Sequence, residues 1–102
     1  MPGAHRDTDL RFCEAKTTVV GQTSLTVEGK LWAVEGDPNS HGDGKLKAVY
    51  GPQTVTIEGK KVICAVGDTA GGDKHEHSPG QTDPKEHSLK VLVYGGAAGG
   101  GK

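Results

Sequence analysis

The sequence predicts a small all-β fold built from repeated β-hairpins, and three observations lead to this prediction. The 102 residues include 17 Gly and five Pro, so turns are expected to be frequent and helices rare. Two stretches, 20–37 and 50–68, repeat one pattern of alternating apolar and polar residues. No helical periodicity extends over ten residues, and runs of β-branched residues argue against a disordered chain.

The two copies align on Gly21 and Gly51 and share the pattern G-x-x-[ST]-[LV]-T-[VI]-E-G-K, followed by an apolar run and a Gly-Asp pair. Each copy predicts two short strands that turn at Glu-Gly: SLTVEG into KLWAVEG, and TVTIEG into KKVICAVG. Half-copies open the chain in DTDLRFCEAKTTVVG and close it in DPKEHSLKVLVYGG. A single hairpin cannot bury its own apolar face, so the copies must pack on one another. We therefore expect a three-lobed pyramid or cone, with a generic hairpin array such as a small barrel as the alternative.

One domain is expected over residues 1–96, followed by a flexible Gly-rich tail over 97–102. Only 32% of the residues are apolar and 4% are aromatic, which leaves little material for a core. Such a domain needs a further source of stability, and a bound metal is one.

The net charge is −1 and charges of both signs are interspersed, so no nucleic-acid or membrane-binding face is indicated. No segment is apolar enough for a signal peptide or a transmembrane span. We therefore expect a protein that is made in the cytoplasm and exported, if at all, by a non-standard route. In the cytoplasm, Cys13 and Cys64 are expected to be free thiols or metal ligands rather than a disulfide.

A potential metal ligand recurs four residues after an Asp. The pairs are Asp9 and Cys13, Asp37 and His41, and Asp83 and His87. After Asp68 the fourth position is a Gly, but His75 and His77 follow shortly afterwards, and one or both are candidate ligands. His5 lies outside the copies and is expected to be solvated, whereas Cys64, in the apolar run VICAVG, is expected in the core.

Three imidazoles and one thiolate form a complete tetrahedral set for one structural Zn²⁺, with no position left for a substrate. Neutral imidazole and thiolate also suit Fe²⁺. An enzyme is not expected, because a Cys-His nucleophile needs an orienting third group and a pocket. The sequence also has no phosphate-binding loop, zincin helix or G-x-S-x-G elbow.

The stretch GPQTVTIEGKKVICAVGD resembles the repeat of the PAAR (Pro-Ala-Ala-Arg) family, whose usual form is close to G-S-x-x-V-x-[IV]-N-G-K-P-A-A-R-V-G-D. GDPNSHGDG resembles the family's G-D-x-x-x-H-G-G turn, and GDTAGGDKH resembles its second turn, G-D-x-x-x-C-x-x-H. The resemblance covers most of residues 7–95, although both copies lack the Ala-Ala-Arg itself and the last lobe is shortened.

The resemblance implies a conical, three-lobed tip that caps the trimeric β-helical spike, of the VgrG or phage type, of a contractile injection machine. Such machines are type VI secretion systems, phage-like particles and contractile phage tails. The implied tip has one copy per trimer, helps to puncture the target envelope in transient contact with its membrane, and can carry effector cargo. The implied apical ligands are Cys13, His41, His75 and His87, with His77 as a substitute for His75.

The apolar surface toward the spike is expected around Val55, Ile57, Val91 and Val93. Two alternatives come from other functional classes. One is a free-standing metal-binding β-module, and the other is a small thiol enzyme that uses Cys13 or Cys64 with a neighbouring His.

Overall fold

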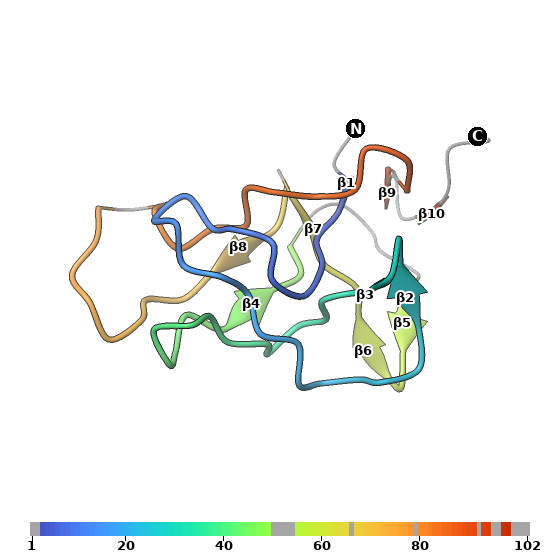
Figure 1. Cartoon of the computed structure of the whole chain (residues 1–102), viewed down its shortest axis with the longest axis horizontal. Helices are drawn as coiled ribbons and strands as arrows, with labels where there is room; N and C mark the ends of the chain where they lie inside the picture. The colour runs from blue at the N-terminus through green and yellow to red at the C-terminus, as the bar shows by residue number, and fades with distance from the viewer. Residues whose placement is uncertain are drawn as a thin grey trace.

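The computed structural model describes residues 3–49, 55–65, 67–78, 80–91, 93–94 and 97–98. Within them, the chain forms only short antiparallel strands, turns and loops, which confirms the predicted all-β class (Figure 1). The described part of the chain contains five two-stranded sheets: β1 (Gly3–Ala4) with β7 (Cys64–Ala65), β2 (Thr26–Val27) with β3 (Lys30–Leu31), β4 (Leu46–Lys47) with β8 (Thr69–Ala70), β5 (Thr56–Ile57) with β6 (Lys60–Lys61), and β9 (Val93–Tyr94) with β10 (Ala97–Ala98). Among the described residues, no helix is long and apolar enough to cross a membrane.

The two predicted hairpins are present and use the same turn. Glu28-Gly29 joins β2 to β3 with φ of 54° and 84°, and Glu58-Gly59 joins β5 to β6 with φ of 53° and 82°. Positive φ at both central residues defines a type I′ turn, whose twist matches that of the flanking strands. Glycine adopts this conformation freely, but for glutamate it is strained.

The centre of the molecule is a closed ring of three chain segments, 4–6, 32–34 and 62–64, which we call the central ring. The backbone N–H of His5 donates to the carbonyl of Ile63, that of Ile63 to Ala33, and that of Ala33 to His5, at 3.1, 2.9 and 2.8 Å. The flanking residues pair antiparallel in the same cyclic order: Arg6 with Trp32, Val34 with Val62, and Cys64 with Ala4. The three segments are therefore equivalent units around an approximate threefold axis.

Ala33 and Ile63 occupy the same position in the two sequence copies, so the N-terminal segment around His5 provides the third copy. Alternate residues of the ring point to opposite sides and join two apolar clusters. One cluster consists of Ala4, Val27, Trp32, Val34, Ile57, Val62 and Cys64, and the other of Val19, Ala33, Leu46 and Ile63. Cys64 is buried, as predicted, and its thiol donates to Asp68 Oδ2 at 3.4 Å.

Ile57, which was expected to face a partner, belongs to the first cluster and is 8% exposed. Val55 and Val91 are half-buried and pack against the same cluster. The side chain of Val93 lies outside the described part of the chain. An apolar contact surface at these positions therefore stays a prediction.

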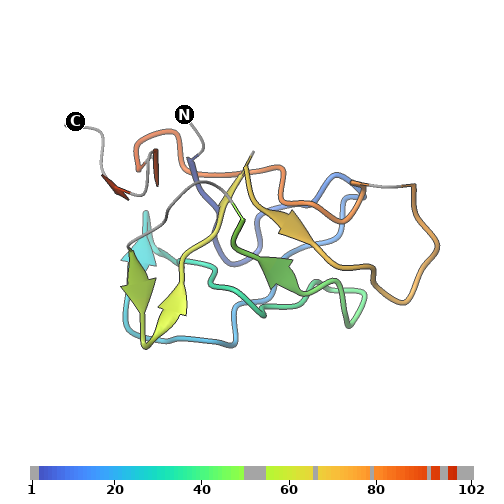
Figure 2. The same ribbon diagram turned by 180° about the vertical axis from the view of Figure 1, so that it is seen from behind.

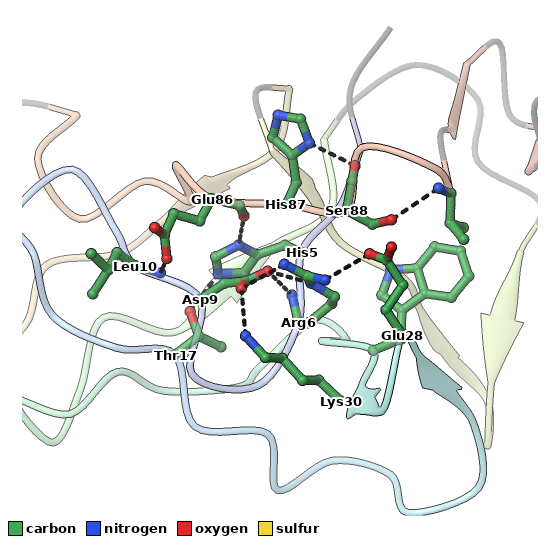
Figure 3. A network of polar contacts seen from close by, with 12 residues as sticks. His5, Arg6, Asp9, Leu10, Thr17, Glu28, Lys30, Glu86, His87 and Ser88 are labelled. Atoms are coloured by element: carbon green, nitrogen blue, oxygen red, sulfur yellow. Dashed lines mark hydrogen bonds and ion pairs between the residues drawn. The ribbon is translucent and has the colours of Figure 1, made fainter.

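His5 is buried, so the expectation of a solvated side chain is wrong. Its exposed fraction is 0%, its Nδ1 lies 2.6 Å from the Glu86 carbonyl oxygen and its Nε2 lies 2.5 Å from Thr17 Oγ1 (Figure 3). Burial lowers the pKa of His5 to about 4, so the imidazole is neutral at pH 7. The sequence pattern could not reveal this burial, because the first copy lacks the Gly-Lys motif that marks the other two.

The Asp that ends each copy has a structural role. Asp9, Asp37 and Asp68 accept hydrogen bonds from backbone N–H groups three or four residues earlier, at 2.9, 2.9 and 2.8 Å. Asp9 also binds the side chains of Arg6 and Lys30 in the network of Figure 3. The recurring Asp thus closes the turn from which the next loop begins.

The molecule measures 39 × 25 × 22 Å along its principal axes. Segments 10–16, 38–45, 71–78 and 80–85 gather at one end of the long axis, which we call the loop end (Figures 1 and 2). Hairpins β2–β3 and β5–β6 lie at the opposite end, which we call the hairpin end, and β4–β8 lies between. A conical outline stays a prediction. Within the predicted tail, Ala97 and Ala98 pair with Tyr94 and Val93, and the rest lies outside the described residues.

Candidate metal centre

Four side chains at the loop end form a cluster that could hold a metal ion: Cys13, His41, Asp73 and His77. One potential ligand atom from each lies within 4.8 Å of those of the other three, and all four residues are half-buried. They come from three loops that are distant in the sequence, so an ion bound here would cross-link the loop end.

Asp73 is the centre of this cluster, and its side chain is 0% exposed. The carboxylate accepts hydrogen bonds from His41 Nδ1 at 2.8 Å and from His77 Nε2 at 2.9 Å. It also accepts them from Asn39 Nδ2 at 2.9 Å and from the backbone N–H of His75 at 2.8 Å. Burial by itself would raise the pKa of Asp73, but these hydrogen bonds outweigh it and hold the pKa well below its usual range. Asp73 is therefore ionised at neutral pH and able to bind a cation.

The loop that carries His41 is a tight turn shaped by its own polar groups. Asn39 Oδ1 accepts a hydrogen bond from the His41 N–H at 2.9 Å, which forms an Asx turn. The Asn39 N–H donates to the Asp43 carbonyl at 2.7 Å, and its carbonyl accepts from the Gly42 N–H at 2.9 Å. Gly42 and Gly44 have φ of 99° and 70°, a region in which glycine is favoured. The sequence Asn-Ser-His-Gly-Asp-Gly therefore fixes the backbone from which the imidazole projects.

Arg11, two residues before Cys13, connects the loops from inside the molecule. Its side chain is fully buried, and Nε donates to Thr17 Oγ1 at 2.6 Å. Nη1 donates to the carbonyls of Gly44 and Thr82 at 2.6 and 3.0 Å. Burial lowers the pKa of Arg11 to about 10, so the guanidinium remains charged at pH 7. Its fixed positive charge partly balances the acidic groups of the loop end.

Three of the five predicted ligands, Cys13, His41 and His77, are brought together in this cluster. His75 lies beside it, with its ring centroid 4.2 Å from that of His41 and 6.2 Å from that of His77. His87 lies away from the cluster, where its Nδ1 donates to the Ser88 carbonyl at 2.8 Å (Figure 3).

Sequence reasoning missed Asp73. Its signal is the spacing in GGDKHEH, which places a carboxylate two and four residues before His75 and His77. An acidic residue in a polar loop is common, and the partners that distinguish this one, His41 and Asn39, are more than thirty residues away.

The donor chemistry fits a borderline divalent cation. Thiolate, imidazole and carboxylate are all ligands of zinc. The oxygen–nitrogen distances around Asp73, 2.8 and 2.9 Å, are shorter than the roughly 3.3 Å between neighbouring ligands on a tetrahedral zinc ion. An ion bound by these same oxygen and nitrogen atoms would therefore need them to move slightly apart.

Comparison of the chain with protein-family models, with curated proteins and with solved structures found no match. The functional interpretation therefore depends on the sequence repeat and on the geometry of the central ring and the loop end.

Proposed function

We propose that this chain is a non-enzymatic structural protein, the metal-stabilised tip that caps the trimeric spike of a contractile injection machine. The observation that carries the proposal is the central ring, in which three segments make equivalent backbone hydrogen bonds. A single chain with three similar units can present three similar surfaces to three identical subunits, which overcomes the symmetry mismatch between a monomer and a trimer. The PAAR-like turns GDPNSHGDG and GDTAGGDKH support the same proposal.

The proposed ion is a single structural Zn²⁺, with Fe²⁺ as the second choice. Zinc binds thiolate, imidazole and carboxylate in a closed four-coordinate site, and Fe²⁺ accepts the same donors. No described residue of the loop end belongs to either apolar cluster. A bound ion would therefore supply at this end the cross-links that hydrophobic packing supplies around the central ring, and would stiffen the part of a tip that meets a target.

In this proposal the chain is made in the cytoplasm, assembles on the blunt end of the spike and travels outward when the machine contracts. It contacts the target membrane transiently and provides a point of attachment for effector cargo. The loop end, which carries the metal ligands, is the leading end, and the hairpin end faces the spike.

Native mass spectrometry of the chain mixed with the trimeric spike protein of the same organism tests the proposal. One chain per trimer is the expected stoichiometry. A spike trimer truncated at its blunt end is the control and should not bind. Absence of a complex, or a ratio other than one to three, would contradict the proposal.

A free-standing metal-binding module is the second candidate. It is favoured by the side chains of His41 and His77, which remain 26% and 18% exposed and would leave a bound ion accessible to solvent. A chelator distinguishes the two functions. Release of the ion from the folded chain within minutes would favour the module, whereas release only on unfolding would favour the structural tip.

A further inference from the structure

We propose that Asn39 is a positioning residue of the metal centre. It holds the loop that carries His41 against the loop that carries Asp73, and it thereby sets the affinity of the cluster for Zn²⁺. This inference rests on the proposed metal-binding function and adds to it a residue that is not itself a ligand.

The amide of Asn39 bridges two members of the cluster that belong to different loops. Asn39 is 2% exposed. Its Oδ1 accepts from the His41 N–H at 2.9 Å, and its Nδ2 donates to Asp73 Oδ2 at 2.9 Å. The orientation of the amide follows from these partners, since only the oxygen can accept from an N–H and only the nitrogen can donate to a carboxylate.

The backbone of Asn39 is fixed as well, through the Asp43 carbonyl and the Gly42 N–H. Gly44 leaves room for the amide, because a Cβ at this position would lie 2.6 Å from Asn39 Nδ2. The Asn39 side chain is therefore confined to one position, and its two hydrogen bonds set the position of the Asp73 carboxylate relative to the His41 imidazole.

Such a bridge affects metal binding through preorganisation. Without it, the two loops would have to be ordered when the ion binds, and the cost would appear as lost affinity. Loss of a hydrogen-bond partner that orients a metal ligand typically weakens metal affinity by about 10–100-fold.

Two variants separate the two hydrogen bonds of the amide. Asn39→Ser keeps an oxygen that can accept from the His41 N–H but is too short to reach Asp73. Asn39→Ala removes both bonds. Gln22→Ala is the matched control, because Gln22 is also a buried amide, 1% exposed, whose side chain hydrogen-bonds Ser24, Leu25 and Trp32 outside the cluster.

The experiment is competition for Zn²⁺ between the full, untagged chain and a chromophoric chelator, together with the absorption spectrum of the Co²⁺-loaded chain. Both Asn39 variants are expected to bind Zn²⁺ about 10–100-fold more weakly and to give a changed Co²⁺ spectrum. Gln22→Ala is expected to lower the denaturant midpoint while keeping the wild-type zinc affinity and Co²⁺ spectrum.

Wild-type zinc affinity in folded Asn39→Ser and Asn39→Ala would overturn the inference. An equal loss of affinity in Gln22→Ala would overturn it too, since the effect would then reflect general destabilisation. A wild-type chain that binds no Zn²⁺ would refute the metal-binding function itself. Failure of the inference alone looks different: the wild-type chain binds zinc, and the Asn39 variants bind it equally well.

Discussion

The central ring and the loop end are stabilised by different interactions. Around the ring, Ala33, Val34, Val62 and Ile63 are all 0% exposed, and the backbone groups pair in a closed cycle. At the loop end, the buried groups include the guanidinium of Arg11, the amide of Asn39 and the carboxylate of Asp73, each held by hydrogen bonds. Buried polar groups are tolerated only when they are satisfied. Apolar packing therefore dominates around the ring, whereas the loop end depends on a polar network and, in our proposal, on an ion.

The largest expected effect is loss of the ion. Cys13→Ser should abolish tight zinc binding, and a structural zinc in a small module contributes on the order of 10 kcal/mol of apparent binding free energy. Hydrogen exchange measured by mass spectrometry should accelerate strongly over 10–16, 38–45 and 71–78 and much less over the central ring. Elemental mass spectrometry of the untagged protein measures the metal content.

Cys64→Ala is the control for this experiment, because it removes the other cysteine, which is buried outside the cluster, and should keep one zinc ion per chain. A wild-type chain that is folded and metal-free, with the same exchange pattern as Cys13→Ser, would contradict the proposed difference between the two ends.

The next largest effect on stability is expected from a substitution in the central ring. Ile63→Ala should lower the free energy of unfolding by about 3 kcal/mol, because the side chain is fully buried and its removal leaves a cavity. Urea unfolding should give the same loss with zinc and with a chelator. Leu89→Ala, at an 83% exposed position, should change stability by less than about 0.5 kcal/mol. Full recovery of Ile63→Ala on addition of zinc would show that the two ends are not independent.

A pH effect of similar size should arise from His5. Its pKa is about 4 in the folded chain, against about 6.5 for an ordinary histidine, so the unfolded chain binds more protons between these values. The free energy of unfolding should therefore be highest above pH 6.5 and fall by about 3 kcal/mol as the pH is lowered to 4. Urea unfolding of chelator-treated protein measures this, with His5→Leu as the comparison, since it lacks the titrating group. Parallel pH curves for the two proteins would refute the assignment to His5.

The smallest effect tests the hairpin end, where both type I′ turns contain a glutamate with positive φ. Asparagine tolerates this conformation better, so Glu58→Asn should raise the free energy of unfolding by about 0.5 kcal/mol. Glu28→Asn loses the ion pair with Arg6 Nη1 at 2.8 Å, and Glu58→Asn loses the hydrogen bonds from Thr23 and Ser24, so neither variant should gain more than the turn preference supplies. Thermal unfolding of both variants measures the difference. A less stable Glu58→Asn would mean that its hydrogen bonds with Thr23 and Ser24 outweigh the turn preference.

Much of the fold could be predicted from the sequence because its determinants are local. The alternation of apolar and polar residues and a Glu-Gly pair encode each hairpin within a few residues. The apolar run VICAVG correctly predicted that Cys64 lies in the core. The candidate site was predicted in part. Donor chemistry and spacing selected Cys13, His41 and His77, which the cluster contains, together with His75 and His87, which lie outside it.

The sequence by itself therefore determined the all-β class, the two hairpins and the type of chemistry at the loops, since strand alternation, turn preference and donor atoms are properties of short segments. Only the tertiary structure decided that segments around His5, Ala33 and Ile63 close into a ring and that Asp73 is the centre of the cluster. These features depend on partners such as His41 and Asp73, which are 32 residues apart in the chain. No local sequence pattern predicts such a pairing, because it forms only when the repeated hairpins pack and bring their loops to the same end of the molecule.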